Sequence, residues 1–114
     1  MQMTIEGVTF TLNLIENPAS QTLLANLPLT LTMDDLHRNE KYASLDQSYP
    51  IQPQSVGQIN AGDVMLFGSN TLVIFYDSFS TSYAYTPIGQ ISEVDQLISL
   101  LNHNQAVEIP FTLE

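Results

Sequence analysis

Tyrosines and hydroxyl side chains are concentrated in the stretch YDSFSTSYAYTPIG, which runs from Tyr76 to Gly89 and contains a single charged residue. Tyr83 and Tyr85 are two positions apart, so they share a face if this stretch is a strand. A tyrosine presents a flat apolar ring and a polar tip, which suits a surface that binds a peptide or a small molecule. The alternative is that one or both rings pack in the core, with the hydroxyl bonded to backbone.

Positive charge is scarce in this chain. Arg38 and Lys41 are the only bases against twelve acidic residues, and the formal net charge is -10. Nucleic acids and anionic membranes are bound through clusters of positive charge, so we expect neither as a partner. The acidity favours solubility and also leaves open an acidic surface that attracts a basic partner.

The spacings of the common catalytic and metal sites are absent from the sequence. His37 and His103 are the only histidines and lie far apart, and there are no cysteines, so we expect no metal site and no disulfide. There is no G-x-S-x-G elbow, no phosphate-binding order of glycines and no calcium-loop spacing. The sequence therefore predicts no cofactor.

The elements that must position the tyrosines begin with strands. MQMTI and VTFTLNL alternate between apolar and polar residues, as half-buried strands do, and Glu6-Gly7 between them predicts a two-residue hairpin turn. Asn17 followed by Pro18 is typical of a helix start, and the pattern predicts a short helix through about Asn26. LPLTLTM then returns to the alternation of a strand.

The second half of the chain predicts further strands and a second helix. GQINAGDVMLFGSNTLVIFY indicates two strands joined at residues 68–70, and its apolar run from Leu72 to Tyr76 is typical of a strand buried on both faces. TPIGQI predicts another strand. Ser92, with Asp95 three positions later, predicts a capping box at the start of a helix. The apolar stripe of that helix consists of Val94, Leu97, Ile98 and Leu101. AVEIPFTL predicts a final strand, in which Pro110 indicates an edge or a bulge.

The segment from Asp34 to Pro53 is polar and irregular, with both bases, four acids and two tyrosines. We expect a long surface loop here, and such loops often carry function.

Together these elements predict an all-β fold: a closed barrel of about seven or eight strands, with two short helices covering its ends, in a single domain over residues 1–114. The first residues lack the pattern of a signal peptide, and no apolar run approaches the roughly 20 residues of a membrane span. We therefore expect a cytoplasmic protein.

The order of these elements resembles the cyclophilin-like superfamily. A hairpin, a helix that starts with proline and a third strand resemble the cyclophilin opening, and TPIGQISEVDQLISLL resembles its ending, with Gly89 in the place of the family's glycine. LPLTLTMDDL, NEKYASL, AGDVMLFGSNTLVIFY and TSYAYTPIG are similar to a group of compact bacterial cyclophilin-like proteins. This similarity covers almost the whole chain and implies the cyclophilin-like barrel. Members of that group mostly lack an assigned activity.

Cyclophilins isomerise X-Pro peptide bonds with an arginine and an apolar pocket. The Leu-His-Arg that ends at Arg38 resembles the family's Phe-His-Arg, which makes Arg38 the candidate catalytic residue. Asn39 and Glu40 depart from the apolar residues that follow in the family, its Phe-Met-x-Gln-Gly-Gly-Asp motif is absent, and there is no tryptophan. Tyr85 falls where a histidine lines the family's pocket.

Three functions are left open. The first is a non-catalytic module that binds a peptide or a small molecule in a groove near Tyr42, Tyr76, Tyr83 and Tyr85. The second is a weak peptidyl-prolyl isomerase that uses Arg38. The third is a structural or oligomer-forming domain. The missing pocket residues favour the first and third, and the sequence specifies neither a ligand nor an oligomeric state.

Overall fold

Alternating apolar and polar residues produce most of the strands in the computed structural model, which describes residues 1–113. The longer strands are β1 (Gln2–Ile5), β2 (Val8–Leu14), β3 (Leu29–Leu36), β4 (Glu40–Ser44), β7 (Asp63–Phe67), β8 (Thr71–Phe75), β10 (Ala84–Ile91) and β11 (Val107–Thr112). The two-residue strands are β5 (Gln54–Ser55), β6 (Gln58–Ile59) and β9 (Phe79–Ser80). The helices are α1 (Pro18–Ala25) and α2 (Val94–Leu101).

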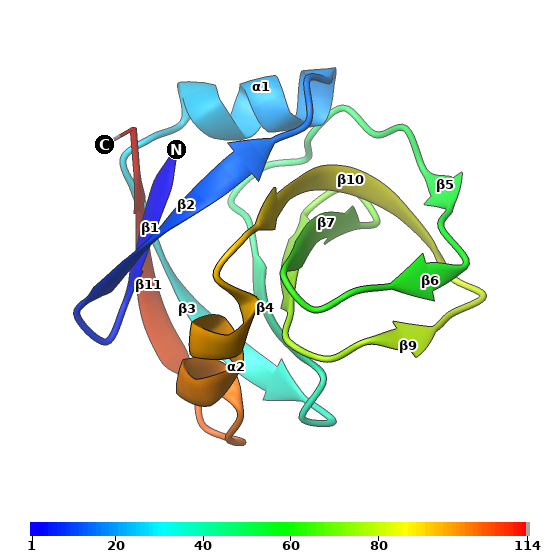
Figure 1. Ribbon diagram of the computed structural model, residues 1–114. Coiled ribbons are helices and arrows are strands. Elements are labelled where there is room, and N and C mark those ends of the chain that lie inside the picture. Colours follow the sequence, from blue (N-terminus) through cyan, green and yellow to red (C-terminus); the bar gives the residue numbers. More distant parts are fainter. Residues whose placement is uncertain (114) are drawn as a thin grey trace.

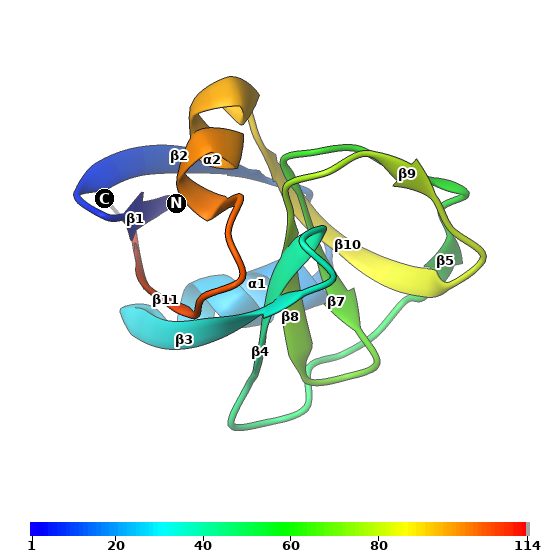
Figure 2. The ribbon, with the colours of Figure 1, turned by 90° about the horizontal axis from the view of Figure 1, so that it is seen from below.

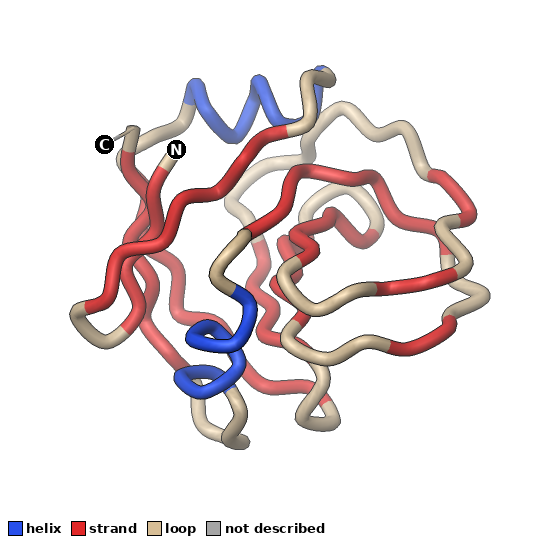
Figure 3. The backbone as a smooth tube through the Cα atoms, in the orientation of Figure 1, coloured by secondary structure: helices blue, strands red, loops and turns tan. Residues whose placement is uncertain are grey.

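The longer strands close into one antiparallel barrel (Figure 1, Figure 2). Their order is β2-β1-β11-β3-β4-β8-β7-β10, and β10 pairs with β2 to complete the ring. The helices lie far apart on the barrel, α1 along the top of the view in Figure 1 and α2 in its lower part. Figure 3 shows how little of the described chain is helical. The predicted all-β barrel with two short helices is confirmed.

Local signals near the N-terminus act as predicted. Glu6 and Gly7 both have positive φ, 49° and 82°, as the two-residue hairpin turn between β1 and β2 requires. At the start of α1 the Asn17 side chain accepts a hydrogen bond from the Ser20 backbone N–H, and the Asn17 N–H donates to the Ser20 hydroxyl. This reciprocal cap fixes where α1 begins, and the helix ends at Ala25.

The predicted cap of α2 is wrong. Glu93, not Ser92, is the N-cap residue, and no side-chain hydrogen bond caps the helix. The Ser92 hydroxyl donates instead to the Glu93 carboxylate, 2.7 Å away. Packing therefore holds this short helix in place: Leu97 and Leu101 of the predicted stripe are completely buried against the barrel.

The long loop predicted over residues 34–53 is also wrong in its first half. β3 continues to Leu36 and β4 begins at Glu40, so the chain reverses within the three residues between them, with His37 and Arg38 at the centre of the turn. Both residues have positive φ, 54° and 57°, and the Asn39 N–H closes the turn on the Leu36 carbonyl at 3.0 Å. The sequence hides this turn because it has no glycine at either position, although such turns favour it.

Pro110 does not mark an edge strand or a bulge. β11 lies between β1 and β3, and Pro110 sits in unbroken register opposite Thr30 of β3. The pairing of β11 with β1 covers only Phe111 and Thr112. The ladder between β11 and β1 starts after Pro110. The absence of an N–H on Pro110 therefore costs no hydrogen bond to β1.

Two apolar clusters form on the two faces of the barrel wall. The larger one fills the barrel and includes Leu72, Ile74 and Tyr76. The smaller one lies on the outer face and consists of Ile59, Met65, Val73, Phe75 and Tyr85. It is covered by the segments with β6 and β9, at the right of Figure 1. This second cluster explains why residues 72–76 are apolar at every position, as the sequence predicts for a strand buried on both faces.

Candidate functional site

A cavity of about 660 Å³ lies on the outer face of the barrel wall. Its residues come from the β3–β4 turn, from β4, β7, β8 and β10, and from β9 with the loop that follows it. Cavities of this size are typical of small-molecule sites. The strand pairing of the wall determines which side chains reach it.

The register of β4 and β8 sorts their side chains between the two faces. Paired residues of antiparallel strands point to the same side, and successive residues alternate. Glu40, Tyr42 and Ser44 of β4 therefore face outwards together with their partners on β8. Lys41 and Ala43 face the barrel interior with theirs.

Aromatic rings form much of the cavity wall. Phe67 lies between Tyr83 and Tyr85, with ring centroids 6.1 Å and 5.7 Å away. Tyr85 also packs edge-on against Phe75 at 5.5 Å, and Phe75 contacts Phe79 at 5.8 Å. Tyr85 is only 6% exposed and forms the base of this group, whereas Tyr83 is 63% exposed at its mouth. The rings offer flat apolar faces to whatever enters.

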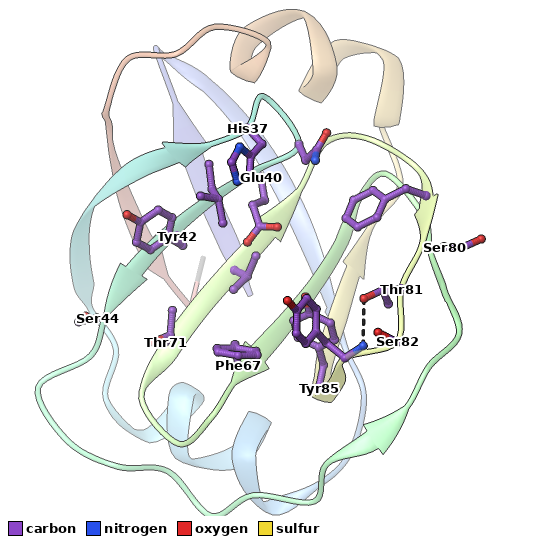
Figure 4. Close-up of a pocket in the computed structure, with 15 residues that line it drawn as sticks. His37, Glu40, Tyr42, Ser44, Phe67, Thr71, Ser80, Thr81, Ser82 and Tyr85 are labelled. Atoms are coloured by element: carbon purple, nitrogen blue, oxygen red, sulfur yellow. Dashed lines mark hydrogen bonds between the residues drawn. The ribbon is translucent and has the colours of Figure 1, made fainter.

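Hydroxyl groups line the side of the cavity formed by the loop after β9. Ser80, Thr81 and Ser82 lie there (Figure 4). The Thr81 hydroxyl accepts a hydrogen bond from the Tyr83 N–H at 3.1 Å, which ties the loop to the start of β10. These groups supply donors and acceptors beside the apolar rings.

Glu40 brings a carboxylate to the cavity. Figure 4 shows this carboxylate directed towards the middle of the lining side chains, with His37 above it and Tyr42 beside it. Burial, together with the nearby negative charge of Asp35, raises the pKa of the Glu40 carboxyl to about 7. Burial and the negative charge of Glu40 also raise the pKa of the Tyr85 hydroxyl. The charge of Glu40 therefore interacts with the Tyr85 hydroxyl on the other side of the cavity.

The neighbouring residue Lys41 belongs to a separate network inside the barrel. Its ammonium group is fully buried and donates to Asp35 Oδ1 at 3.1 Å and to the carbonyls of His103 and Gln105 at 2.7 and 2.8 Å. The Tyr76 hydroxyl donates to the same carboxylate, and the ammonium lies 5.6 Å from the Tyr76 ring centre. The network ties the β3–β4 hairpin to the chain after α2.

Asp35 is ionised in this network. Burial acts to raise the pKa of Asp35, but hydrogen bonds from the Tyr76 hydroxyl, the Arg38 backbone N–H and the Lys41 ammonium outweigh it and hold this pKa below its usual range. The ammonium of Lys41 is thereby neutralised in place and has no free donor to offer the cavity.

The structure divides the tyrosines that the sequence groups together. Tyr42, Tyr83 and Tyr85 line the cavity, and their role in binding stays a prediction. Tyr76 does not line it, because it lies two residues beyond Ile74 and so faces the barrel interior, where it is 3% exposed. The sequence grouped it by residue type and not by strand parity.

Arg38 also lies apart from the cavity lining. Its guanidinium donates to the Asn102 side chain at 3.2 Å, next to the end of α2. A bond of this kind directs the group towards α2, which gives no support to an arginine poised over a bound prolyl bond.

Glu40, His37 and Phe67 are lining residues that sequence reasoning did not select. Glu40 and His37 were hidden in the expected loop, and a hairpin reading of residues 34–44 is the signal that places both beside Tyr42. Phe67 follows the alternation of β7, where Met65 and Phe67 face outwards opposite Val73 and Thr71. Of the residues described, no group of three or more histidine, aspartate or glutamate side chains is arranged to hold a metal. No helix within residues 1–113 is long and apolar enough to cross a membrane.

Comparison with known proteins places the chain by its sequence. A model of the family described as the cyclophilin-like family matches residues 3–112, nearly the whole length. Searches of curated proteins and of solved structures give no significant match.

Proposed function

The chain belongs to the cyclophilin-like family, and from that premise we propose that it is a non-catalytic binding module whose ligand, a peptide or a small molecule, occupies the cavity outside β4, β7 and β8. The observation that carries this proposal is the cavity itself. It combines about 660 Å³ of space with rings that pack against one another and hydroxyls along one side. Ligand sites are typically apolar concavities with a few polar groups that orient the ligand.

The rigidity of the wall supports the same proposal. The side chains at the base of the cavity stand on the central strands of a closed barrel, and Val73 and Phe75 are almost completely buried beneath it. A preformed site loses little conformational entropy when a ligand enters. Tyr83 at the mouth is exposed, so it is the ring that gains most contact on binding.

Isomerase activity has weaker support. A catalyst must stabilise the twisted amide more than the planar one, and a cation held against the bond in a water-free site does this. Arg38 is bonded to Asn102 and does not line the cavity, and Lys41 is sequestered inside the barrel. We therefore assign no catalytic role to either base.

Binding is tested by NMR titration of the ¹⁵N-labelled protein with capped proline-containing peptides and with a library of small aromatic compounds. We expect shift changes centred on Tyr42, Phe67 and Tyr85 for at least one compound. Tyr83→Ala should weaken that compound about tenfold, the loss expected for one interfacial aromatic ring. Ile15→Ala removes an exposed side chain that is 44% accessible and outside the cavity, and it should leave the affinity unchanged.

The catalytic alternative is tested in the same samples by exchange NMR on an Ala-Pro peptide. We expect no acceleration of cis/trans exchange beyond a weak effect, and the same result for Arg38→Ala. Strong catalysis that disappears in Arg38→Ala would overturn the non-catalytic assignment. The absence of any shift changes in the cavity would overturn the binding assignment.

A further inference from the structure

The cavity contains one carboxylate among aromatic rings, and neither a lysine nor an arginine of the described lining balances its charge. Of the described residues that line it, Glu40 is the only acid. Tyr42, Tyr83, Tyr85 and Phe67 lie around the same space. Aromatic faces carry negative electrostatic potential and attract cations, so the rings and the carboxylate favour the same sign of charge.

Strand parity keeps the protein's own cations away from this carboxylate. Lys41 follows Glu40 directly, so its side chain points through the opposite face of β4 and donates to Asp35 and two backbone carbonyls. Arg38 donates to Asn102 and is not a lining residue. The only ion pair within residues 1–113 is the one between Lys41 and Asp35. The chain therefore leaves Glu40 without a counter-charge although it has a base next to it in sequence.

The environment of Glu40 makes its charge costly while the cavity is empty. Burial and the negative charge of Asp35 raise the pKa of its carboxyl to about 7. A cation that enters the cavity relieves both effects, because it replaces lost hydration and opposes the charge of Asp35. A neutral ligand can at most donate a hydrogen bond to the carboxylate, and it carries no charge to oppose that of Asp35.

We propose that the ligand of this cavity is an organic cation, a primary ammonium or guanidinium group on an apolar stem, with its charged head beside Glu40 and its stem against Phe67, Tyr83 and Tyr85. This inference rests on the proposed binding function and specifies its ligand class. The cation is either a free amine or the lysine or arginine side chain of a peptide. The net charge of -10 adds a general attraction for either source.

Other titratable groups face Glu40 and have to be separated from it in any test. Asp35 lies behind it on β3, His37 lies above it on the turn, and Tyr42 and Tyr85 flank the cavity on β4 and β10. His37 is the histidine of the cavity lining, so its contribution has to be measured separately from that of Glu40. The His37→Gln variant reports its share.

The test uses three probes that share a phenylethyl group and differ in its charged or polar head: 2-phenylethylammonium, 2-phenylethanol and 3-phenylpropionate. NMR titration at pH 8 should give the tightest binding for the ammonium probe and the weakest for the carboxylate probe. Glu40→Gln should reduce the ratio of ammonium to alcohol affinity about tenfold, because it removes the one charge pair that the ammonium group forms in the cavity. Glu108→Gln removes the same charge from an exposed position on β11 and should leave the ratio unchanged.

The pH dependence of the wild type gives a second measurement that needs no variant. A cation prefers the ionised carboxylate, so its affinity should fall about tenfold between pH 8 and pH 6 as Glu40 becomes protonated. The alcohol affinity should not follow this curve. His37→Gln should retain the fall, and Glu40→Gln should lose it.

The outcomes separate this inference from the function beneath it. If the alcohol binds in the cavity as tightly as the ammonium probe, or if Glu40→Gln keeps the preference, the cation assignment is overturned and the binding function stands. If no probe and no peptide shifts the cavity resonances, both are overturned. Binding of a capped Ala-Lys-Ala peptide but not its norleucine analogue assigns the cation to a peptide side chain. Binding of the ammonium probe alone assigns it to a free amine.

Discussion

Two residues adjacent in sequence, Glu40 and Lys41, have opposite environments because a strand sends them to opposite faces. Lys41 is neutralised by Asp35 and two carbonyls, whereas Glu40 has no such partner within the described residues. A carboxyl whose pKa is raised on folding binds a proton more tightly in the folded state. Its contribution to stability is therefore largest at low pH and is lost as pH rises from the ordinary glutamate range through about 7.

Glu40→Gln should accordingly stabilise the protein at pH 8 by about 1 kcal/mol, a value reduced for screening by water at this partly open site. At pH 4 the wild-type carboxyl is protonated in the folded state and mostly protonated in the unfolded state, so the variant should have nearly the wild-type free energy of unfolding. Urea denaturation at the two pH values measures the difference. Glu108→Gln should show no such change, and an equal effect of Glu40→Gln at both pH values would contradict the burial of its charge.

Residue types alone could identify only part of the candidate site. Tyr42, Tyr83 and Tyr85 were predicted near one groove and line one cavity, Tyr42 and Tyr85 from the strands β4 and β10 and Tyr83 from the loop before β10. Tyr76 could have been excluded by counting two residues from Ile74, since Leu72 and Ile74 face the interior. Glu40 could be placed only after the hairpin at His37 and Arg38 was known.

At the scale of elements, periodicity predicted the strands and helices where one face is apolar and failed where both faces carry polar groups. β3 and β4 contain Asp35 and Lys41, whose charges are satisfied by partners distant in sequence. These bonds form only in the folded protein, so the sequence around Asp35 and Lys41 shows polar residues on both faces and indicates a loop. The α2 cap failed for a related reason: the helix is held by Leu97 and Leu101 and needs no capping side chain.

Leu97→Ala should therefore destabilise the protein by about 2–5 kcal/mol, the usual cost of truncating a fully buried leucine. Leu24 of α1 is 38% exposed, and Leu24→Ala should cost less than about 1 kcal/mol because it leaves no closed cavity. Chemical denaturation of the two variants compares the same chemical change on two helices. If Leu97→Ala cost no more than Leu24→Ala, the docking of α2 would not be a source of stability.

At the scale of the whole molecule, closure of the barrel makes the outer cavity possible. The strands β4, β8, β7 and β10 can carry an apolar outer face only because their inner face is already covered by the rest of the ring. The count of strands and the closed form were predictable from the number of short alternating segments. The outer cluster was not, since the segments that cover it contain strands of only two residues.

The seam between β10 and β2 completes the ring, and Gly89 lies opposite Leu14 in it. A Cβ at this position would lie 2.4 Å from the Asn13 carbonyl oxygen, which is backbone and has little freedom to move. The strands approach so closely here that only glycine fits. The sequence resemblance to cyclophilins matches Gly89 to the glycine of that family. The close approach of the two strands gives a packing reason for a glycine at this position.

Gly89→Ala should therefore destabilise the barrel by about 2–3 kcal/mol, as overpacked sites do. It should also speed amide exchange along the seam, for example at Ile15, whose N–H donates to the Ile88 carbonyl at 2.9 Å. Gly68→Ala is the matched control: its φ is +61° and no atom lies within 4 Å of the new Cβ, so only backbone strain of about 1 kcal/mol is expected. Because the seam and the cavity share β10, Gly89→Ala should also lower the affinity of the cavity for a ligand. Two results together would contradict this prediction: equal destabilisation by Gly89→Ala and Gly68→Ala, and unchanged amide exchange at Ile15. They would mean that close packing at this seam adds nothing to the stability of the barrel.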